Sequence, residues 1–358
     1  MKSWLLLTLP SLLAAGDGPD PNRVKEAIQR YAPILVLHDD EKYLPTSVEE
    51  FLAVTTPCTY KEDGKDHKGL QLKNNADMKM RGGNLQKAKT YVNVKVDKAS
   101  GTLDLQYWFL YAFNGPGTIY TADFKSVPSV APGLAWFTKR IFDTNQPKIN
   151  TYELKELGVH EGDWEHLTVR VSAKDGRIVT DRAVFMSAHG SGGWLPAAKV
   201  LDKGITDPTA DRVWAYASKN GHALFPRADR YLYSAVKMPG TGKVLFGMVN
   251  DASKVGSSID YGRAFADRSP RWQIFGVQGD DVLRKALMPT EPAFIQKYPD
   301  RWGRFMTKKH PLEDIKVLGG LMGDLLKKVG AYDEFTLEAG PQPPWKKDIW
   351  TAPETGGH

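Results

Sequence analysis

Cysteine is almost absent from this sequence of 358 residues, in which Cys58 is the only one. A single cysteine excludes an intramolecular disulfide, so the fold must be held by its hydrophobic core. We expect Cys58 to be a small buried hydrophobic residue rather than a catalytic nucleophile.

Long hydrophobic runs are absent after the N-terminus, where 18 apolar residues never follow one another. We therefore expect no membrane-spanning helix beyond residue 16. The N-terminus itself has a lysine at position 2, an apolar run over 4–13 and small residues over 14–16. This order is typical of a secretory signal. It predicts cleavage near residue 16 and a protein that is secreted or lies in the secretory pathway.

A strong excess of one charge is also missing. The 48 Lys and Arg residues stand against 42 Asp and Glu residues, which gives a formal net charge of +6, and the two signs are interspersed. So small an excess gives little support to nucleic-acid binding, and we expect no nucleic-acid partner. With 41% hydrophobic residues, the composition is that of an ordinary folded protein.

The middle of the chain carries the period of a β-sheet. Apolar residues alternate with polar ones over 91–96 and 103–113, which indicates half-buried strands. A turn at 174–176 predicts a hairpin between 167–171 and 178–186. These features favour a mainly β fold, with an antiparallel β-sandwich or jelly-roll-like core, over a βαβ sheet.

Helical patterns lie toward both ends of the chain. Apolar residues recur at i, i+3 and i+4 in several segments, and we predict helices over 21–31, 47–52, 281–288, 291–298 and 312–329, with a strand over 34–37. The predicted organisation is a signal at 1–16, a β-rich core domain at 17–262, and a helical C-terminal extension with its tail at 263–358.

One segment is dense in ionisable side chains. The seven residues of 160–166 read His-Glu-Gly-Asp-Trp-Glu-His, directly before an alternating apolar strand. Period two places Asp163 and Glu165 on the same face as Leu167. Two like charges on a partly buried face are unfavourable unless one is protonated or a cation lies between them.

His160 can turn back across Gly162 toward that face and add a nitrogen ligand to the two carboxylates. His160, Asp163 and Glu165 then form a candidate site for Mg²⁺, Mn²⁺, Ca²⁺ or Zn²⁺. The alternative is that these side chains only make hydrogen bonds and salt bridges, and spacing alone leaves it open. The segment is not the helical zincin motif, because Trp164 stands four residues after His160.

Two further histidines follow predicted strands. His189 lies in the glycine-rich stretch 187–194, and His222 lies in the stretch 216–223. In a metal-assisted hydrolase either histidine could act as the acid, with Glu161 or Glu165 as the base.

Several motifs in this order resemble the vacuolar protein sorting-associated protein sixty-two family. They are Tyr-Ala-Pro at 31–33, His38, Glu-Lys-Tyr-Leu-Pro at 41–45, the aromatic strand 106–114, His-Glu-Gly-Asp-Trp-Glu at 160–165, Ser-Ala-His-Gly at 187–190 and Gly-His-Ala at 221–223. The family's name implies a role in delivery to the vacuole.

The His-x-x-Asp-Trp-Glu pattern is also similar to the signature of the necrosis-inducing toxin family. These are secreted β-sandwich proteins that hold a divalent cation used in membrane attack. The resemblance implies that His160, Asp163 and Glu165 are cation ligands, while Tyr152 occupies the position of the toxins' upstream acidic ligand.

Three functions follow from these observations. The first is a secreted, divalent-cation-dependent protein that binds a glycan or an anionic lipid head group, with peripheral membrane contact or a toxin-like activity. The second is a metal-assisted hydrolase of a glycan or phosphoester. The third is a vacuolar sorting or interaction protein without catalysis.

Overall fold

The computed structural model describes residues 18–62, 64–73, 82–121, 151–153, 158–173, 184–188, 191–196, 212–237, 244–253, 256–307 and 337–347. The predicted signal, the hairpin turn at 174–176, the predicted helix over 312–329 and His189 lie outside these residues. No helix within the described ranges is long and apolar enough to cross a membrane.

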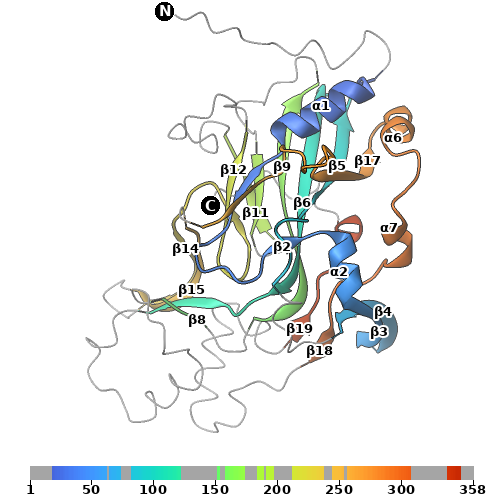
Figure 1. Ribbon diagram of the computed structural model, residues 1–358. Helices are drawn as coiled ribbons and strands as arrows, with labels where there is room; N and C mark the ends of the chain where they lie inside the picture. Colours follow the sequence, from blue (N-terminus) through green and yellow to red (C-terminus); the bar gives the residue numbers. More distant parts are fainter. Residues whose placement is uncertain are drawn as a thin grey trace, which may run out of the picture.

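The largest sheet has seven strands, in the order β11-β10-β9-β6-β5-β17, with β2 paired to β6. Its long central strands β5, β6 and β9 run side by side (Figure 1). The pairs within it are antiparallel except for the parallel pair of β17 with β5. The strands are β2 (Pro45–Thr46), β5 (Thr90–Asp97), β6 (Thr102–Asn114), β9 (His160–Ser172), β10 (Val184–Ala188), β11 (Ser191–Leu195) and β17 (Trp272–Gln278).

A second, four-stranded sheet packs against the first. It consists of β1 (Ile34–Val36), β12 (Trp214–Ala217), β13 (Leu224–Phe225) and β16 (Ser258–Asp260). Buried residues of both sheets form one hydrophobic core, with Leu105 and Leu167 from the first sheet and Leu35 and Ala215 from the second. The predicted mainly β fold with a sandwich core is confirmed.

The described residues form three further sheets, one of four strands and two of two strands. One has the order β14-β15-β7-β8, and the others are the pairs β3-β4 and β18-β19. Their strands are β3 (Thr55–Glu62), β4 (Lys65–Leu72), β7 (Thr118–Thr121), β8 (Thr151–Glu153), β14 (Arg230–Lys237), β15 (Val244–Asp251), β18 (Phe305–Thr307) and β19 (Leu337–Ala339).

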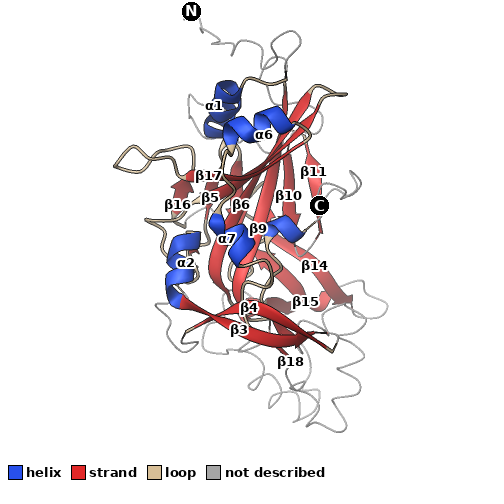
Figure 2. Ribbon diagram, turned by 90° about the vertical axis from the view of Figure 1, so that its right-hand side faces the viewer, coloured by secondary structure: helices blue, strands red, loops and turns tan. Residues whose placement is uncertain are grey.

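The helices α1 and α6 lie together at one end of the long strands, whereas α2 and α7 lie alongside the large sheet (Figure 2). The Asp20 side chain caps α1, whose buried face is Val24, Ala27, Ile28 and Tyr31. The helices are α1 (Pro21–Tyr31), α2 (Val48–Val54), α6 (Asp281–Leu287), α7 (Ala293–Lys297) and the 3-10 helix η1 (Pro344–Lys346). They confirm four of the five predicted helical segments, with small differences at their ends.

The expectation for Cys58 is wrong in one respect. Cys58 lies on β3 with intermediate exposure, because β3 belongs to a two-stranded hairpin that the main core does not cover on both faces. Burial raises the pKa of its thiol, which disfavours the reactive thiolate. The thiol is therefore partly exposed, and its raised pKa disfavours the thiolate form.

Gly162 sets the course of the chain at the start of β9. Its φ of 65° lies in the left-handed region, and a Cβ at this position would overlap the carbonyl oxygen of Trp302. Only glycine meets both demands, because other residues are strained at this φ and would push Trp302 away.

We predict that Gly162→Ala destabilises the fold strongly. The left-handed conformation costs about 1–2 kcal/mol for a residue with a Cβ, and the overlap with Trp302 adds about 1–3 kcal/mol. Urea unfolding monitored by circular dichroism measures the change.

Gly64→Ala is the matched control. Gly64 has a similar φ of 76°, but a Cβ there would meet no atom within 4 Å. Only the conformational cost should appear in this variant. Equal losses of stability in the two variants would contradict a steric role for the Trp302 carbonyl.

Candidate functional site

The two faces of β9 divide its side chains as period two predicts. β9 pairs with β6 so that Asp163 lies opposite Tyr111 and Glu165 lies opposite Phe109. Leu167, Val169 and Val171 continue this face and belong to the core between the sheets. Trp164 packs in the core on the other side of the sheet. Asp163 and Glu165 thus lie at the end of an apolar inner face.

Glu161 does not share this face. It is fully buried, and its Oε2 accepts hydrogen bonds from the backbone N–H groups of Leu72, at 2.9 Å, and Arg304, at 3.2 Å. The guanidinium of Arg304 lies 3.7 Å from its Oε1. Glu161 therefore joins β9 to the end of β4 and to the segment before β18. This contact gives the side chain a structural role and separates it from the carboxylates that follow.

His222 meets Asp163 directly. Its Nδ1 lies 2.9 Å from Asp163 Oδ2, and because a carboxylate accepts, the imidazole donates. The ring is fully buried and stacks on Tyr111, with 3.7 Å between centroids and 7° between planes. The predicted site residues Asp163 and His222, which are 59 positions apart, are therefore brought together.

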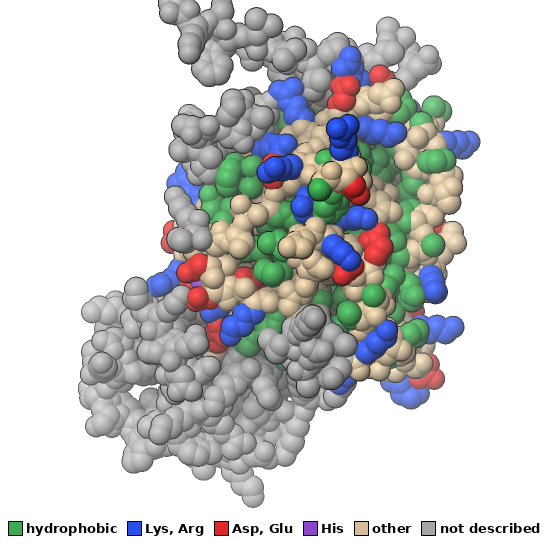
Figure 3. All heavy atoms as spheres, in the orientation of Figure 1, with side chains coloured by type: hydrophobic (Ala, Val, Ile, Leu, Met, Phe, Trp, Pro, Cys, Tyr) green, Lys and Arg blue, Asp and Glu red, His purple; other side chains and the backbone are tan. Residues whose placement is uncertain are grey.

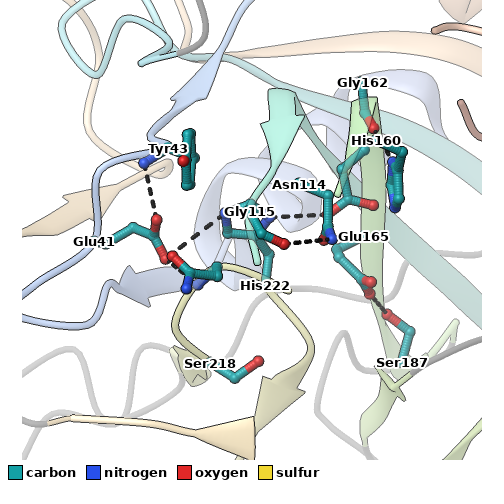
Figure 4. Close-up of polar contacts among 12 residues, drawn as sticks. Glu41, Tyr43, Asn114, Gly115, His160, Gly162, Glu165, Ser187, Ser218 and His222 are labelled. Carbon is teal, nitrogen blue, oxygen red and sulfur yellow. Dashed lines mark hydrogen bonds and ion pairs between the residues drawn. The ribbon is translucent and has the colours of Figure 1, made fainter. Parts of the chain in front are cut away.

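A third member of this cluster is Glu41, in the loop after β1. Its Oε2 lies 3.7 Å from His222 Nε2. Backbone N–H groups of Lys42, Tyr43 and Asn220 donate to its two oxygens at 2.7–2.9 Å. Figure 4 shows Glu41 and His222 pointing toward each other from two separate loops.

The charges in this cluster shift the pKa values of His222 and Glu41. Burial alone would lower the pKa of His222, but the carboxylates of Glu41 and Asp163 outweigh it and raise the pKa to about 9. Burial opposes ionisation of Glu41, yet the charge of His222 lowers its pKa. His222 is thus an imidazolium held between two carboxylates.

Glu165 forms no ion pair among the described residues, although the charges of Lys347 and His222 act on it. Burial and then the negative charge of Asp163 raise its pKa to about 8. Its Oε2 accepts a short hydrogen bond from the Ser187 hydroxyl, at 2.5 Å (Figure 4). The like-charge conflict predicted from the sequence is therefore present, and a proton or a cation must relieve it.

His160 is held in one tautomer. Its Nδ1 lies 2.7 Å from the carbonyl oxygen of Gly162, so Nδ1 carries the donated hydrogen. Burial lowers the pKa of its imidazole, which favours the neutral ring with its lone pair on Nε2. A neutral imidazole whose second nitrogen donates to a backbone carbonyl is the usual state of a metal-binding histidine.

Within the described ranges, one group of three has ligand atoms that all lie within 4.8 Å of one another. It consists of His38, Asp39 and Asp40. His160, Asp163 and Glu165 do not form so tight a group, and their role as ligands stays a prediction.

Glu41 is the residue that sequence reasoning missed as part of the site. It appeared only within the Glu-Lys-Tyr-Leu-Pro motif at 41–45. The one sequence signal was this motif itself, because nothing in the spacing connects residue 41 with residues 163 and 222.

The family described as Vacuolar protein sorting-associated protein 62 matches residues 55–128 and 144–354 of the chain. This chain belongs to that family. The predicted resemblance is thereby confirmed, and the match includes the whole 160–166 segment and His222. A search of curated proteins gave no match.

Solved structures of necrosis-inducing proteins are similar to this family member at low identity. Necrosis and Ethylene inducing Protein 2, from the causal agent of cocoa's Witches Broom disease, is 16% identical, with a TM-score of 0.29 over 62% of this chain and 71% of that one. The non-toxic HaNLP3 protein is 11% identical, with a TM-score of 0.29 over 75% and 79%. NLPPya in complex with glucosamine is 13% identical, with a TM-score of 0.28 over 82% and 93%. The family assignment rests on the sequence match alone.

We predict that Glu161→Ala lowers stability, because the N–H groups of Leu72 and Arg304 lose their acceptor. An unsatisfied buried group costs about 1–3 kcal/mol, and urea unfolding measures the sum. Glu161→Gln keeps an acceptor oxygen and should lose less. A Glu161→Ala protein as stable as the wild type would contradict the structural role.

His166 gives a prediction for pH. Burial and then the charge of Lys347 lower its pKa to about 3 from the usual 6.5. Between these values the unfolded chain binds more protons, so this contribution to stability is complete above pH 6.5 and lost as the pH falls. From pH 7 to pH 5 the loss should be about 2 kcal/mol.

His166→Phe is the comparison variant. The ring of His166 stacks on Phe185, with 5.6 Å between centroids and 13° between planes, so a phenyl ring suits the space. Urea unfolding at pH 7 and pH 5 should show a smaller loss in the variant. An equal pH dependence in both proteins would refute the assignment.

Proposed function

We propose that this chain is a divalent-cation-dependent glycan-binding protein of the secretory pathway, with the cation held at the start of β9. The observation that carries the proposal is the pair of carboxylates Asp163 and Glu165 on one face of the strand, of which Asp163 is buried and Glu165 half-buried. The positive charges of Lys347 and His222 offset the rise in the pKa of Glu165 only in part, and a divalent ion between the two carboxylates would supply further positive charge.

The tautomer of His160 supports the same site. Its Nδ1 hydrogen is donated to the Gly162 carbonyl, and Nε2 is then the ring atom with a lone pair. Such a second contact fixes the orientation of metal-binding imidazoles. His160 would therefore hold the ion through nitrogen, while Asp163 and Glu165 would hold it through oxygen.

One buried polar atom fits an ion with ordered water. The Tyr111 hydroxyl is buried and has no hydrogen-bond partner among the described residues. The Tyr111 ring stacks on His222, which contacts Asp163. A hydrated cation at the carboxylates supplies water oxygens, which are the partners such atoms require.

The donor set favours a small group of ions. Carboxylate oxygens suit Mg²⁺, Ca²⁺ and Mn²⁺, and an imidazole nitrogen also suits Mn²⁺ and Zn²⁺. A bound ion of this kind offers positions to further oxygen ligands. The paired hydroxyls of a sugar meet that requirement, and the phosphate of an anionic lipid head group is the alternative that the experiment separates.

The first test is the metal content of the purified protein, measured by elemental mass spectrometry. We expect one equivalent of a divalent ion in the wild type and none in Asp163→Asn or Glu165→Gln. Thermal melting with added Mg²⁺, Ca²⁺, Mn²⁺ or Zn²⁺ should raise the melting temperature of the wild type only.

The double variant Asp39→Asn, Asp40→Asn is the control, because it alters the other group of candidate ligands. It should keep the ion. Loss of the ion here, with retention in Asp163→Asn, would place the cation site at the loop after β1 and contradict the proposal.

The ligand is tested separately by calorimetry with glucosamine and mannosamine, the amino sugars crystallised with NLPPya, and by sedimentation with vesicles of anionic lipid. Binding of sugar that EDTA abolishes supports the proposal. Cation-dependent binding to vesicles without sugar binding would assign a lipid head group instead.

A further inference from the structure

We propose that Glu41 and His222 are positioning residues, which hold the carboxylate of Asp163 in one orientation so that its second oxygen faces the cation. The inference rests on the proposed function and assigns a role to two residues that are not ligands. The contacts that hold the carboxylate begin at the backbone around Glu41 and end at Asp163.

The first link is the anchoring of Glu41. Its side chain is 2% exposed. Oε1 accepts from the N–H groups of Lys42 and Tyr43, and Oε2 accepts from the N–H of Asn220. Three backbone donors fix both oxygens of one carboxylate, which thus joins the loop after β1 to the loop between β12 and β13.

The second link is the immobile ring of His222. Its backbone has a φ of 55°, in the left-handed region, and its N–H donates to the Ser218 carbonyl at 3.0 Å. Tyr111 stacks on one face of the ring. The backbone, the stacked Tyr111 ring and Glu41 beside Nε2 all hold the imidazole. The direction of Nδ1 is therefore fixed.

The third link is Asp163 itself. His222 Nδ1 donates to Oδ2 at 2.9 Å, and this contact sets the rotation of the carboxylate. Oδ1 is the oxygen that remains for a cation. Residues that hydrogen-bond to a metal ligand without touching the metal orient that ligand, and loss of such a contact typically costs about 10–100-fold in metal affinity.

The chain offers a discriminating pair of variants at position 222. Asparagine tolerates a left-handed φ, and its side-chain NH₂ reaches the place of Nδ1, so His222→Asn keeps the donor to Asp163. His222→Ala removes the donor. Glu41→Gln keeps an acceptor for the backbone but removes the charge beside Nε2.

The test is titration of each metal-free variant with Mn²⁺, followed by electron paramagnetic resonance. We expect His222→Ala to bind about 10–100-fold more weakly, with an altered spectrum of the bound ion. His222→Asn should stay within about threefold of the wild type and keep its spectrum, and Glu41→Gln should lie between the two. Equal affinity in folded His222→Ala, or equal loss in both position-222 variants, would overturn the inference.

A second measurement separates this inference from the proposed function. If the wild type binds none of Mg²⁺, Ca²⁺, Mn²⁺ and Zn²⁺, the proposed function fails. The series of contacts from Glu41 through His222 to Asp163 is then tested by urea unfolding of Glu41→Gln, Asp163→Asn and the double variant. The midpoint shift of the double variant should differ from the sum of the single shifts, because His222 couples the two carboxylates. Additive shifts would overturn the inference.

Discussion

The pairing of β6 with β9 is the constraint on which the rest of the molecule depends. The two strands pair from Thr102 and Ser172 to Asn114 and His160, and each carries apolar side chains on both faces. One face closes the core of the sandwich, and the other closes a second core that contains Trp108, Trp164 and Trp302. Since a slip of one residue would exchange these faces, the register is fixed by both cores at once. The position of every ionisable group at the start of β9 follows from it.

The surface around this framework is mixed in charge. On the face seen in Figure 3, Lys and Arg side chains are interspersed with Asp and Glu and with apolar groups. Carboxylates gather instead within the cluster of Glu41, Asp163 and Glu165. The imidazolium of His222 and the side chain of Lys347 lie beside these carboxylates, so opposite charges face one another inside the fold as they do on its surface.

Sequence patterns predicted those parts of the fold that depend on local periodicity. The alternation of apolar and polar residues over 103–113 and 167–171 was sufficient to predict the strands β6 and β9. It also placed Asp163 and Glu165 on the same face as Leu167. Alternation gave no prediction for Glu161, which precedes the left-handed Gly162 and contacts the backbone of Leu72 and Arg304. It also could not predict the parallel addition of β17 to β5, nor the contact of Glu41 with His222, because both join segments more than 170 residues apart and depend on tertiary packing.

Glu161 and Glu165 show how environment decides the role of chemically identical groups. Both lie near the start of β9 with little exposure, and both are carboxylates that burial should keep neutral. Glu161 accepts hydrogen bonds from two backbone N–H groups and faces the guanidinium of Arg304, so its charge is matched within the fold. Glu165 has the Ser187 hydroxyl and the negative charge of Asp163 instead. The first carboxylate therefore stabilises the chain that surrounds it, whereas burial and the charge of Asp163 raise the pKa of the second, although the charges of Lys347 and His222 oppose them.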